Sequence, residues 1–124
     1  MKSILIVDDN PIIIFGCRQI FDAAGARQIL SADSVTSGFE NYIAHKPDVA
    51  VVDLELGRGE SGLSLIRKIR ELGSRITIVV FTMHDDPTIQ NEALKAGATA
   101  FVSKDADMND LLFACGLIGG AKAA

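Results

Sequence analysis

Short apolar runs alternate with longer segments of helical spacing along the whole chain. Runs such as Ile4 to Val7 are apolar at successive positions, which is typical of strands buried on both faces of a parallel sheet. The pattern predicts five β-α units in an open, doubly wound five-stranded parallel α/β sheet, with helices on both faces and right-handed crossovers. The strands are expected at Ser3–Val7, Gln28–Ala32, Asp48–Val52, Ile76–Phe81 and Thr99–Val102.

Local signals mark where several helices begin and end. Pro11 opens the first helix, and Asp86 with Pro87 forms an N-cap and N1 pair for the fourth. Gly25 and Gly97 stand where a glycine commonly ends a helix. No repeat or internal linker interrupts the pattern, so we expect one domain over residues 1–118, with a tail or the start of a linker at 119–124.

Charge and composition argue against several classes of function. A formal charge of −4 provides no basic patch for nucleic acid or for an anionic membrane. The apolar runs fall short of the roughly 18 residues that indicate a membrane span. Cys17 and Cys115 form no C-x-x-C pair, and no signal-peptide pattern follows Met1. We therefore expect a cytoplasmic domain that contacts neither nucleic acid nor membrane directly.

Polar residues gather where the predicted strands end. Asp8 and Asp9 follow the first strand, Asp53 the third, Thr82 the fourth and Lys104 the fifth. Any one of them could simply be a polar residue that leaves a buried strand. In an open parallel sheet, however, the carboxyl ends of the strands form the edge where ligands bind. Carboxylates crowded together there repel each other, so they share protons or recruit a cation.

The residue types at this edge indicate phosphoryl chemistry. Carboxylate ligands without a nearby His or Cys suit a hard ion such as Mg²⁺. The Thr82 hydroxyl and the Lys104 ammonium add donors for an anion whose charge the metal partly neutralises, as a phosphoryl group requires. A carboxylate in such a place can be a nucleophile, and Asp53 is the best candidate because it lies between the acidic pair and the two donors.

The chain resembles the receiver domain of bacterial two-component response regulators over essentially its whole length. The matching segments, in order, are ILIVDDNP, DVAVVDLEL, IVVFTMHDD and ALKAGATAFVSKD. The last two are most similar to the NarL/FixJ-type subfamily, in which the receiver usually precedes a helix-turn-helix DNA-binding domain. The resemblance implies a flavodoxin-like strand order, 2-1-3-4-5, and a role in signalling and transcription control rather than classical enzymatic turnover.

The resemblance also implies a role for each acidic residue. Asp53 would accept a phosphoryl group from the phosphohistidine of a sensor histidine kinase or phosphotransfer protein. Asp9, Asp53 and the backbone carbonyl of Glu55 would hold Mg²⁺. Asp8 would act on the same ion through water.

Two further residues would contact the phosphoryl group, and a third would change its position in response. Lys104 would pair with its oxygens, and Thr82 would hydrogen-bond to one of them. Movement of Thr82 would free space for Phe101 to turn inward, which changes the surface formed by the fourth helix and the fifth strand and helix. The output would be a population shift, with a homodimer that forms on phosphorylation as an expected consequence.

Four positions depart from the family pattern. Gly57 takes the place of a common proline in the loop after the acceptor, and Gly62 lies one residue later than expected. Asp105 follows Lys104 where many relatives have proline, so a cis bond is not expected there. The switch position holds Phe101 rather than tyrosine, so it carries no hydroxyl.

Two pairs of residues carry hypotheses of their own. Glu55 and His84 follow the acceptor and Thr82 by two positions each, and we expect them to tune how readily water reaches the acyl phosphate. For His84 alone, a solvated loop residue is the simpler interpretation. Ile12 and Phe15 lie near Asp9 on the first helix and are expected to help dock the phosphodonor, although a single exposed aromatic residue is also ordinary.

Four other functions each fit part of the sequence. Gly57, Gly59 and Gly62 spell G-x-G-x-x-G, but a dinucleotide loop should follow the first strand, whereas this one follows the third. A flavodoxin-like electron carrier would also need its phosphate loop after the first strand, where the chain is acidic. An aspartate phosphatase would use Glu55 as its second acid. The alternative to a receiver that acts through a DNA-binding domain is a stand-alone receiver, or an interaction module regulated without phosphorylation.

Overall fold

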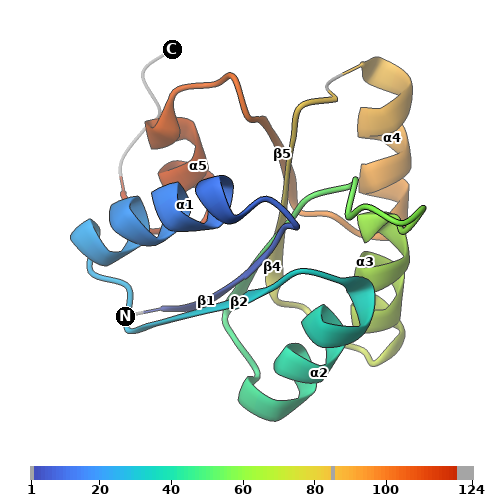
Figure 1. Ribbon diagram of the computed structural model, residues 1–124, viewed down its shortest axis with the longest axis horizontal. Helices are drawn as coiled ribbons and strands as arrows, with labels where there is room; N and C mark the ends of the chain where they lie inside the picture. Colours follow the sequence, from blue (N-terminus) through green and yellow to red (C-terminus); the bar gives the residue numbers. More distant parts are fainter. Residues whose placement is uncertain (1, 85, 120–124) are drawn as a thin grey trace.

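The fold is an open parallel sheet with helices on both faces, seen in a computed structural model that describes residues 2–84 and 86–119 (Figure 1). The strands are β1 (Ser3–Val7), β2 (Gln28–Ala32), β3 (Val49–Val52), β4 (Thr77–Thr82) and β5 (Ala100–Ser103). The helices are α1 (Pro11–Ala23), α2 (Val35–His45), α3 (Gly62–Glu71), α4 (Pro87–Ala96) and α5 (Met108–Ala114). The strand order is β2-β1-β3-β4-β5 with parallel pairing throughout, which confirms the expected fold and order.

The first two strands have the expected bounds, and the other three begin one residue later than expected. Thr82 was expected to follow β4, but it is the last residue of that strand. The reason is that the ladder to β5 continues to this point: Thr82 is in register with Ser103, and its carbonyl oxygen accepts from the Lys104 amide at 2.9 Å.

The expected helix signals are confirmed. Pro11 begins α1, with Asn10 as its N-cap. The Asp86 carboxylate accepts from the Ile89 amide at 3.0 Å and caps α4. Gly25 and Gly97 end α1 and α4 with φ of 88° and 119°, a left-handed conformation that glycine adopts without steric cost.

Two apolar layers form the core, one on each face of the sheet. Figure 1 shows α1 and α5 on one face and α2, α3 and α4 on the other. Successive residues of a strand alternate between the layers: Ile4 and Ile6 pack with α1 and α5, and Leu5 and Val7 pack with α2 and α3. The sheet is therefore buried on both sides, as the unbroken apolar runs indicate.

The buried face of α1 is centred on Cys17 and Phe21. Cys115 belongs to the same layer, and burial raises the pKa of the two thiols to about 11 for Cys17 and about 12 for Cys115. Within the described residues, no helix is long and apolar enough to cross a membrane. Of the expected tail at 119–124, all but Gly119 lies outside the described residues.

Candidate functional site

The strand order reverses between β1 and β3, and the candidate site lies at the carboxyl ends of these strands. After β1 the chain moves outward to β2 and then returns to the other side of β1 as β3. Ligands of open α/β sheets bind at this kind of switch point. The ladder fixes the site residues by their backbones: the Asp8 amide donates to Ala32 O at 3.0 Å and the Asp53 amide to Val7 O at 2.9 Å.

Lys104 joins two of the aspartates. Its Nζ lies 2.8 Å from Oδ2 of Asp8 and 2.8 Å from Oδ2 of Asp53. The three side chains are nearly buried, with exposed fractions of 8% for Lys104, 3% for Asp8 and 8% for Asp53. An ammonium group between two carboxylates is a favourable arrangement in such a shielded place, because each charge has an opposite partner within contact distance.

Burial and charge act in opposite directions on the protons of this group. Burial lowers the pKa of Lys104, but its hydrogen bonds to Asp53 and Asp8 outweigh that effect, and the pKa is raised overall. Burial raises the pKa of Asp8 above its usual value, although Lys104 and the Asn10 amide oppose the shift. The lysine is therefore held in its charged form, whereas burial disfavours the charged form of Asp8.

Asp8, Asp9 and Asp53 form a cluster suited to a cation. One carboxylate oxygen from each lies within 4.8 Å of the others. Asp8 and Asp53 are also oriented by backbone amides, since Oδ1 of Asp8 accepts from Asn10 N at 2.8 Å and Oδ1 of Asp53 accepts from Glu55 N at 3.2 Å. An all-oxygen donor set of this kind fits Mg²⁺ or Ca²⁺.

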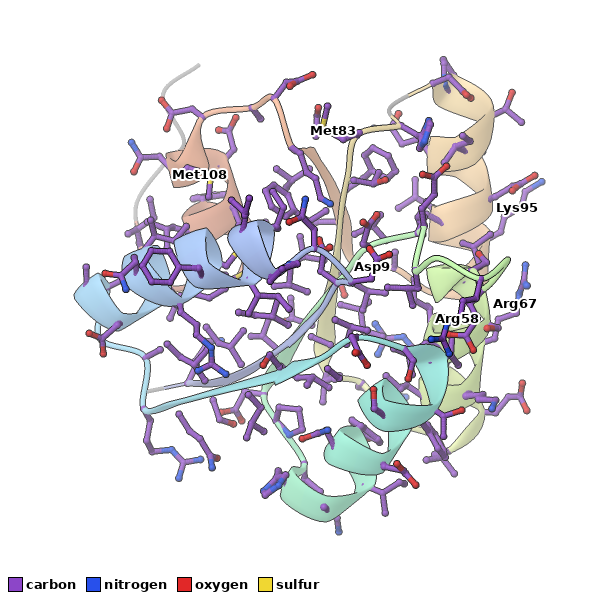
Figure 2. The ribbon with its side chains drawn as sticks, viewed as in Figure 1. Asp9, Arg58, Arg67, Met83, Lys95 and Met108 are labelled. Carbon is purple, nitrogen blue, oxygen red and sulfur yellow. The ribbon has the colours of Figure 1, made fainter. Side chains whose placement is uncertain are left out.

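These residues line an open cleft of about 260 Å³. Thr82 contributes to its wall with a fully buried side chain, and its Oγ1 accepts from the His84 amide at 3.4 Å. Figure 2 labels Asp9 at this edge of the sheet and Met83 beyond the end of β4. The lining residues are Asp8, Asp9, Asn10, Asp53, Glu55, Gly57, Thr82, Met83, His84 and Lys104.

Sequence reasoning missed three of the lining residues as parts of a site: Asn10, Gly57 and Met83. Asn10 carried a usable signal, because it stands directly before the helix-opening Pro11. Its side chain accepts from the Ile12 amide at 2.9 Å and caps α1. Met83 directly follows Thr82 at the end of β4, but its side chain has no chemistry that indicates a functional site.

Glu55 and His84 meet at the mouth of the cleft. Nε2 of His84 lies 2.6 Å from Oε1 of Glu55, which forms an ion pair when the imidazole is protonated. Both side chains are largely exposed, so solvent screens the pair and its contribution to stability is small. The structure thus brings the two residues together beside the acidic cluster.

The glycine-rich segment after β3 is a tight turn beside the same cluster. A Cβ on Gly57 would lie 2.8 Å from Oδ2 of Asp9, and a Cβ on Gly62 would overlap the carbonyl oxygen of Asp53. Gly57 and Gly59 have φ of 73° and 75°. Gly57 and Gly62 therefore permit a close approach of the chain to the acidic residues at the end of β3.

The remaining expected site residues lie outside the cleft. Phe101 is half-buried on β5, opposite Val80 of β4, and packs against the layer that α2, α3 and α4 cover. Ile12 and Phe15 project from the start of α1 with exposed fractions of 77% and 65%. No described peptide bond is cis, which confirms the trans bond expected between Lys104 and Asp105.

The chain is thus an open, doubly wound α/β domain with an aspartate cluster and a bridging lysine at its switch point. The response regulator receiver domain model matches residues 4–115. The chain is therefore a member of the response regulator receiver domain family, a signalling domain of two-component systems.

Two relatives of the chain are regulatory proteins by name. The chain is 38% identical over 104 residues to the methanol utilization control regulatory protein MoxX of Paracoccus denitrificans, covering 83% of this chain and 47% of that protein. It is 31% identical over 113 residues to the oxygen regulatory protein NreC of Staphylococcus haemolyticus, covering 90% of this chain and 52% of that protein. The chain thus spans about half the length of these relatives.

Solved structures agree with the fold. A LuxR-family two-component response regulator from Aurantimonas superposes with a TM-score of 0.85 at 31% identity, over 91% of this chain and 81% of that one. A response regulator from Burkholderia pseudomallei, described with a phosphorylated aspartic acid and a calcium ion, superposes with a TM-score of 0.84 at 28% identity, over 93% of this chain and 66% of that one.

Proposed function

We propose that Asp53 accepts a phosphoryl group from the phosphohistidine of a sensor histidine kinase or of a phosphotransfer protein. The observation that carries the proposal is the Asp53 carboxylate, which lines the cleft and accepts hydrogen bonds from Lys104 on Oδ2 and from the Glu55 amide on Oδ1. A carboxylate oxygen attacks phosphorus, the O–P bond forms, and the N–P bond of the donor breaks, leaving its imidazole to take up a proton.

Asp9, Asp53 and the backbone carbonyl of Glu55 are the proposed ligands of Mg²⁺, with Asp8 acting through a bound water. The close carboxylate oxygens of the cluster support this assignment. When bound, the ion neutralises charge on the phosphoryl oxygens. The Burkholderia relative, with its phosphorylated aspartic acid and calcium ion, supports both parts of the proposal by similarity.

Lys104 and Thr82 are the proposed partners of the phosphoryl group. Lys104 already contacts Asp53, so its ammonium can follow the acceptor oxygen to the new anion. The Thr82 hydroxyl lines the same cleft and can donate to a phosphoryl oxygen. Its movement would make room for Phe101 to turn inward and so alter the surface of α4, β5 and α5.

The proposed role of Glu55 and His84 is to tune hydrolysis of the acyl phosphate. Their contact spans the mouth of the cleft through which water would reach phosphorus. Replacing either residue with Ala should change the dephosphorylation rate of the labelled protein. An unchanged rate in both variants would contradict this role.

Ile12 and Phe15 are the proposed docking residues for the phosphodonor. They are large, apolar and exposed at the end of α1 nearest Asp9. Phe15→Ala should slow transfer from the cognate kinase while phosphorylation by acetyl phosphate stays at the wild-type rate. Transfer from the kinase as fast as wild type would contradict docking through this residue.

The output we propose is control of transcription from the cytoplasm, through a DNA-binding domain carried by a longer chain or through a homodimer that forms on phosphorylation. The relatives named above support this, since they are regulators about twice as long as this chain. The domain is expected to assist its own phosphorylation and dephosphorylation rather than turn over a separate substrate.

Mass spectrometry of the protein incubated with acetyl phosphate and Mg²⁺ tests the central proposal. One added phosphoryl group is expected on the wild type and none on Asp53→Asn, which keeps the size of the side chain but removes the nucleophile. No label on the wild type, or equal labelling of Asp53→Asn, would overturn the assignment. The first of these results would favour an interaction module that works without phosphorylation.

A further inference from the structure

The segment between β3 and α3 is a small hairpin held by its own backbone. Glu60 N donates to Gly57 O at 2.9 Å, Leu56 N donates to Glu60 O at 3.3 Å, and Glu55 pairs with Ser61 in an antiparallel bridge. The two central residues of the turn, Arg58 and Gly59, have φ of 51° and 75°. Positive φ at both positions is the signature of a type I′ hairpin turn.

The side chain of Glu60 extends from this hairpin to the start of α2. Its Oε1 accepts from the amide of Val35 at 3.0 Å. Val35 is the first residue of α2, where a backbone N–H has no partner within its own helix. The N-cap, Ser34, accepts instead from Ser37 N at 3.0 Å. A carboxylate from a different segment thus supplies the missing acceptor, in the place where the helix dipole favours negative charge.

We propose that Glu60 is a positioning residue for the metal site, because it anchors the hairpin that carries Glu55 to the start of α2. This inference rests on the proposed function, in which the Glu55 carbonyl is a metal ligand. The backbone N–H of Glu55 donates a hydrogen bond to Oδ1 of Asp53, and Glu55 also pairs with Ser61 within the hairpin. Glu60 is the side chain that connects this hairpin to α2.

The hairpin also lies close to the acidic cluster. A Cβ on Gly57 would lie 2.8 Å from Oδ2 of Asp9, and a Cβ on Gly62 would overlap the carbonyl oxygen of Asp53. A displacement of the hairpin would therefore reach the residues that are the proposed metal ligands.

Removing the anchor should loosen the hairpin and weaken Mg²⁺ binding. Residues that orient metal ligands without touching the metal typically change affinity by about 10- to 100-fold, and one contact among several should lie near the lower end. We therefore expect Glu60→Ala to raise the Kd for Mg²⁺ about 10-fold. Glu60→Gln keeps an oxygen that can accept from Val35, so its Kd should stay within about twofold of wild type.

A substitution of Val35, whose backbone N–H is the donor in the contact with Glu60, provides an independent test. Val35→Pro removes the N–H that Glu60 binds, and proline is well tolerated at the first position of a helix. Ser34, with φ of −150° and ψ of 167°, already has a conformation compatible with a following proline. Val35→Pro should raise the Kd as Glu60→Ala does, and the double variant should add nothing further.

Titration of the full chain with MgCl₂, followed by NMR of backbone amides or by calorimetry, measures the Kd. Unfolding midpoints in EDTA show how far each variant is destabilised without metal. The matched control is Glu40→Ala, which removes an exposed carboxylate from α2 itself. It should bind Mg²⁺ as the wild type does. A purely structural role for Glu60 would lower the midpoint and leave the Kd unchanged.

Two results would overturn the inference. One is a Kd within twofold of wild type in either folded variant, Glu60→Ala or Val35→Pro. The other is a Glu60→Gln variant as weak as Glu60→Ala. Both leave the proposed function intact if the wild type binds Mg²⁺ and is labelled on Asp53. A wild type that binds no Mg²⁺ would remove the metal site, and the role of Glu60 with it.

Discussion

At the scale of single residues, glycine shows what a sequence can and cannot reveal about this site. Gly57, Gly59 and Gly62 match the sequence pattern of a dinucleotide-binding loop, but each position requires glycine for a physical reason of its own. The reason for Gly62 is close contact, since a Cβ there would overlap the Asp53 carbonyl and lie 2.8 Å from the Val52 side chain. Close approach of this kind depends on how two segments pack, so the sequence could not predict it.

Gly62→Ala should therefore destabilise the protein strongly. The obstacle is the backbone of the acceptor residue, which cannot rotate away, and we expect a loss of about 2–3 kcal/mol in the free energy of unfolding. Gly16 is the matched control, because a Cβ there would meet no atom within 4 Å. Gly16→Ala lies inside α1 and should stabilise the protein by about 0.5–1 kcal/mol.

Urea unfolding of both variants measures these free energies. A Gly62→Ala variant as stable as wild type would show that α3 can shift away from β3 without cost. The same variant should also lose labelling by acetyl phosphate, since the shift needed to fit the methyl group moves the Asp53 backbone.

At the scale of elements, the strands were predicted well and the loops poorly. Runs such as Ile4 to Val7 are apolar at every position, so they are recognised without knowledge of their partners. Their ends place Asp53 and Lys104 at one edge, and the sequence therefore predicted most of the acidic cleft. The hairpin after β3 was not predicted, because its turn and the contact of Glu60 with α2 depend on residues distant in the sequence.

Asp48 links two elements in a way that should depend on pH. It directly precedes β3, and its Oδ2 accepts from the Ser3 amide of β1 at 2.8 Å and from the Ser3 hydroxyl at 3.3 Å. The hydrogen bond from the Ser3 amide, helped by the one from the Ser3 hydroxyl, lowers the pKa of Asp48 below its usual value of 3.8. The folded chain thus favours the carboxylate more than the unfolded chain does. Its contribution is complete above the unfolded pKa and is lost as pH falls through the folded pKa.

Asp48→Ala should reduce the free energy of unfolding more at pH 6 than at pH 2.5. Comparing the variant with wild type at each pH, by urea unfolding, isolates this residue from the other carboxylates that titrate in the same range. Asp22→Ala is the control, since it removes an exposed carboxylate of α1. A cost of Asp48→Ala that is the same at both pH values would show that the charge on Asp48 does not contribute.

At the scale of the whole molecule, the topology concentrates negative charge at one edge. Three aspartates follow two neighbouring strands, and Lys104 pairs with two of them, Asp8 and Asp53. Backbone hydrogen bonds to the adjacent strands hold these two in place. The unfolded chain has no such crowding. Mg²⁺ should therefore bind the folded state far more tightly than the unfolded state, and binding should appear as a gain in stability.

At an Mg²⁺ concentration ten times its Kd, linkage predicts a gain of about 1.4 kcal/mol. For a domain of this size, that corresponds to a rise of about 5 °C in Tm. EDTA should reverse the rise, and NaCl at matched ionic strength should not reproduce it. Asp9→Ala removes an exposed ligand of the cluster without disturbing the contacts of Lys104, so it should fold in EDTA and gain little from Mg²⁺. An equal gain in Asp9→Ala and wild type would place the stabilising ion elsewhere, because a site built from this cluster cannot lose a carboxylate and keep its affinity.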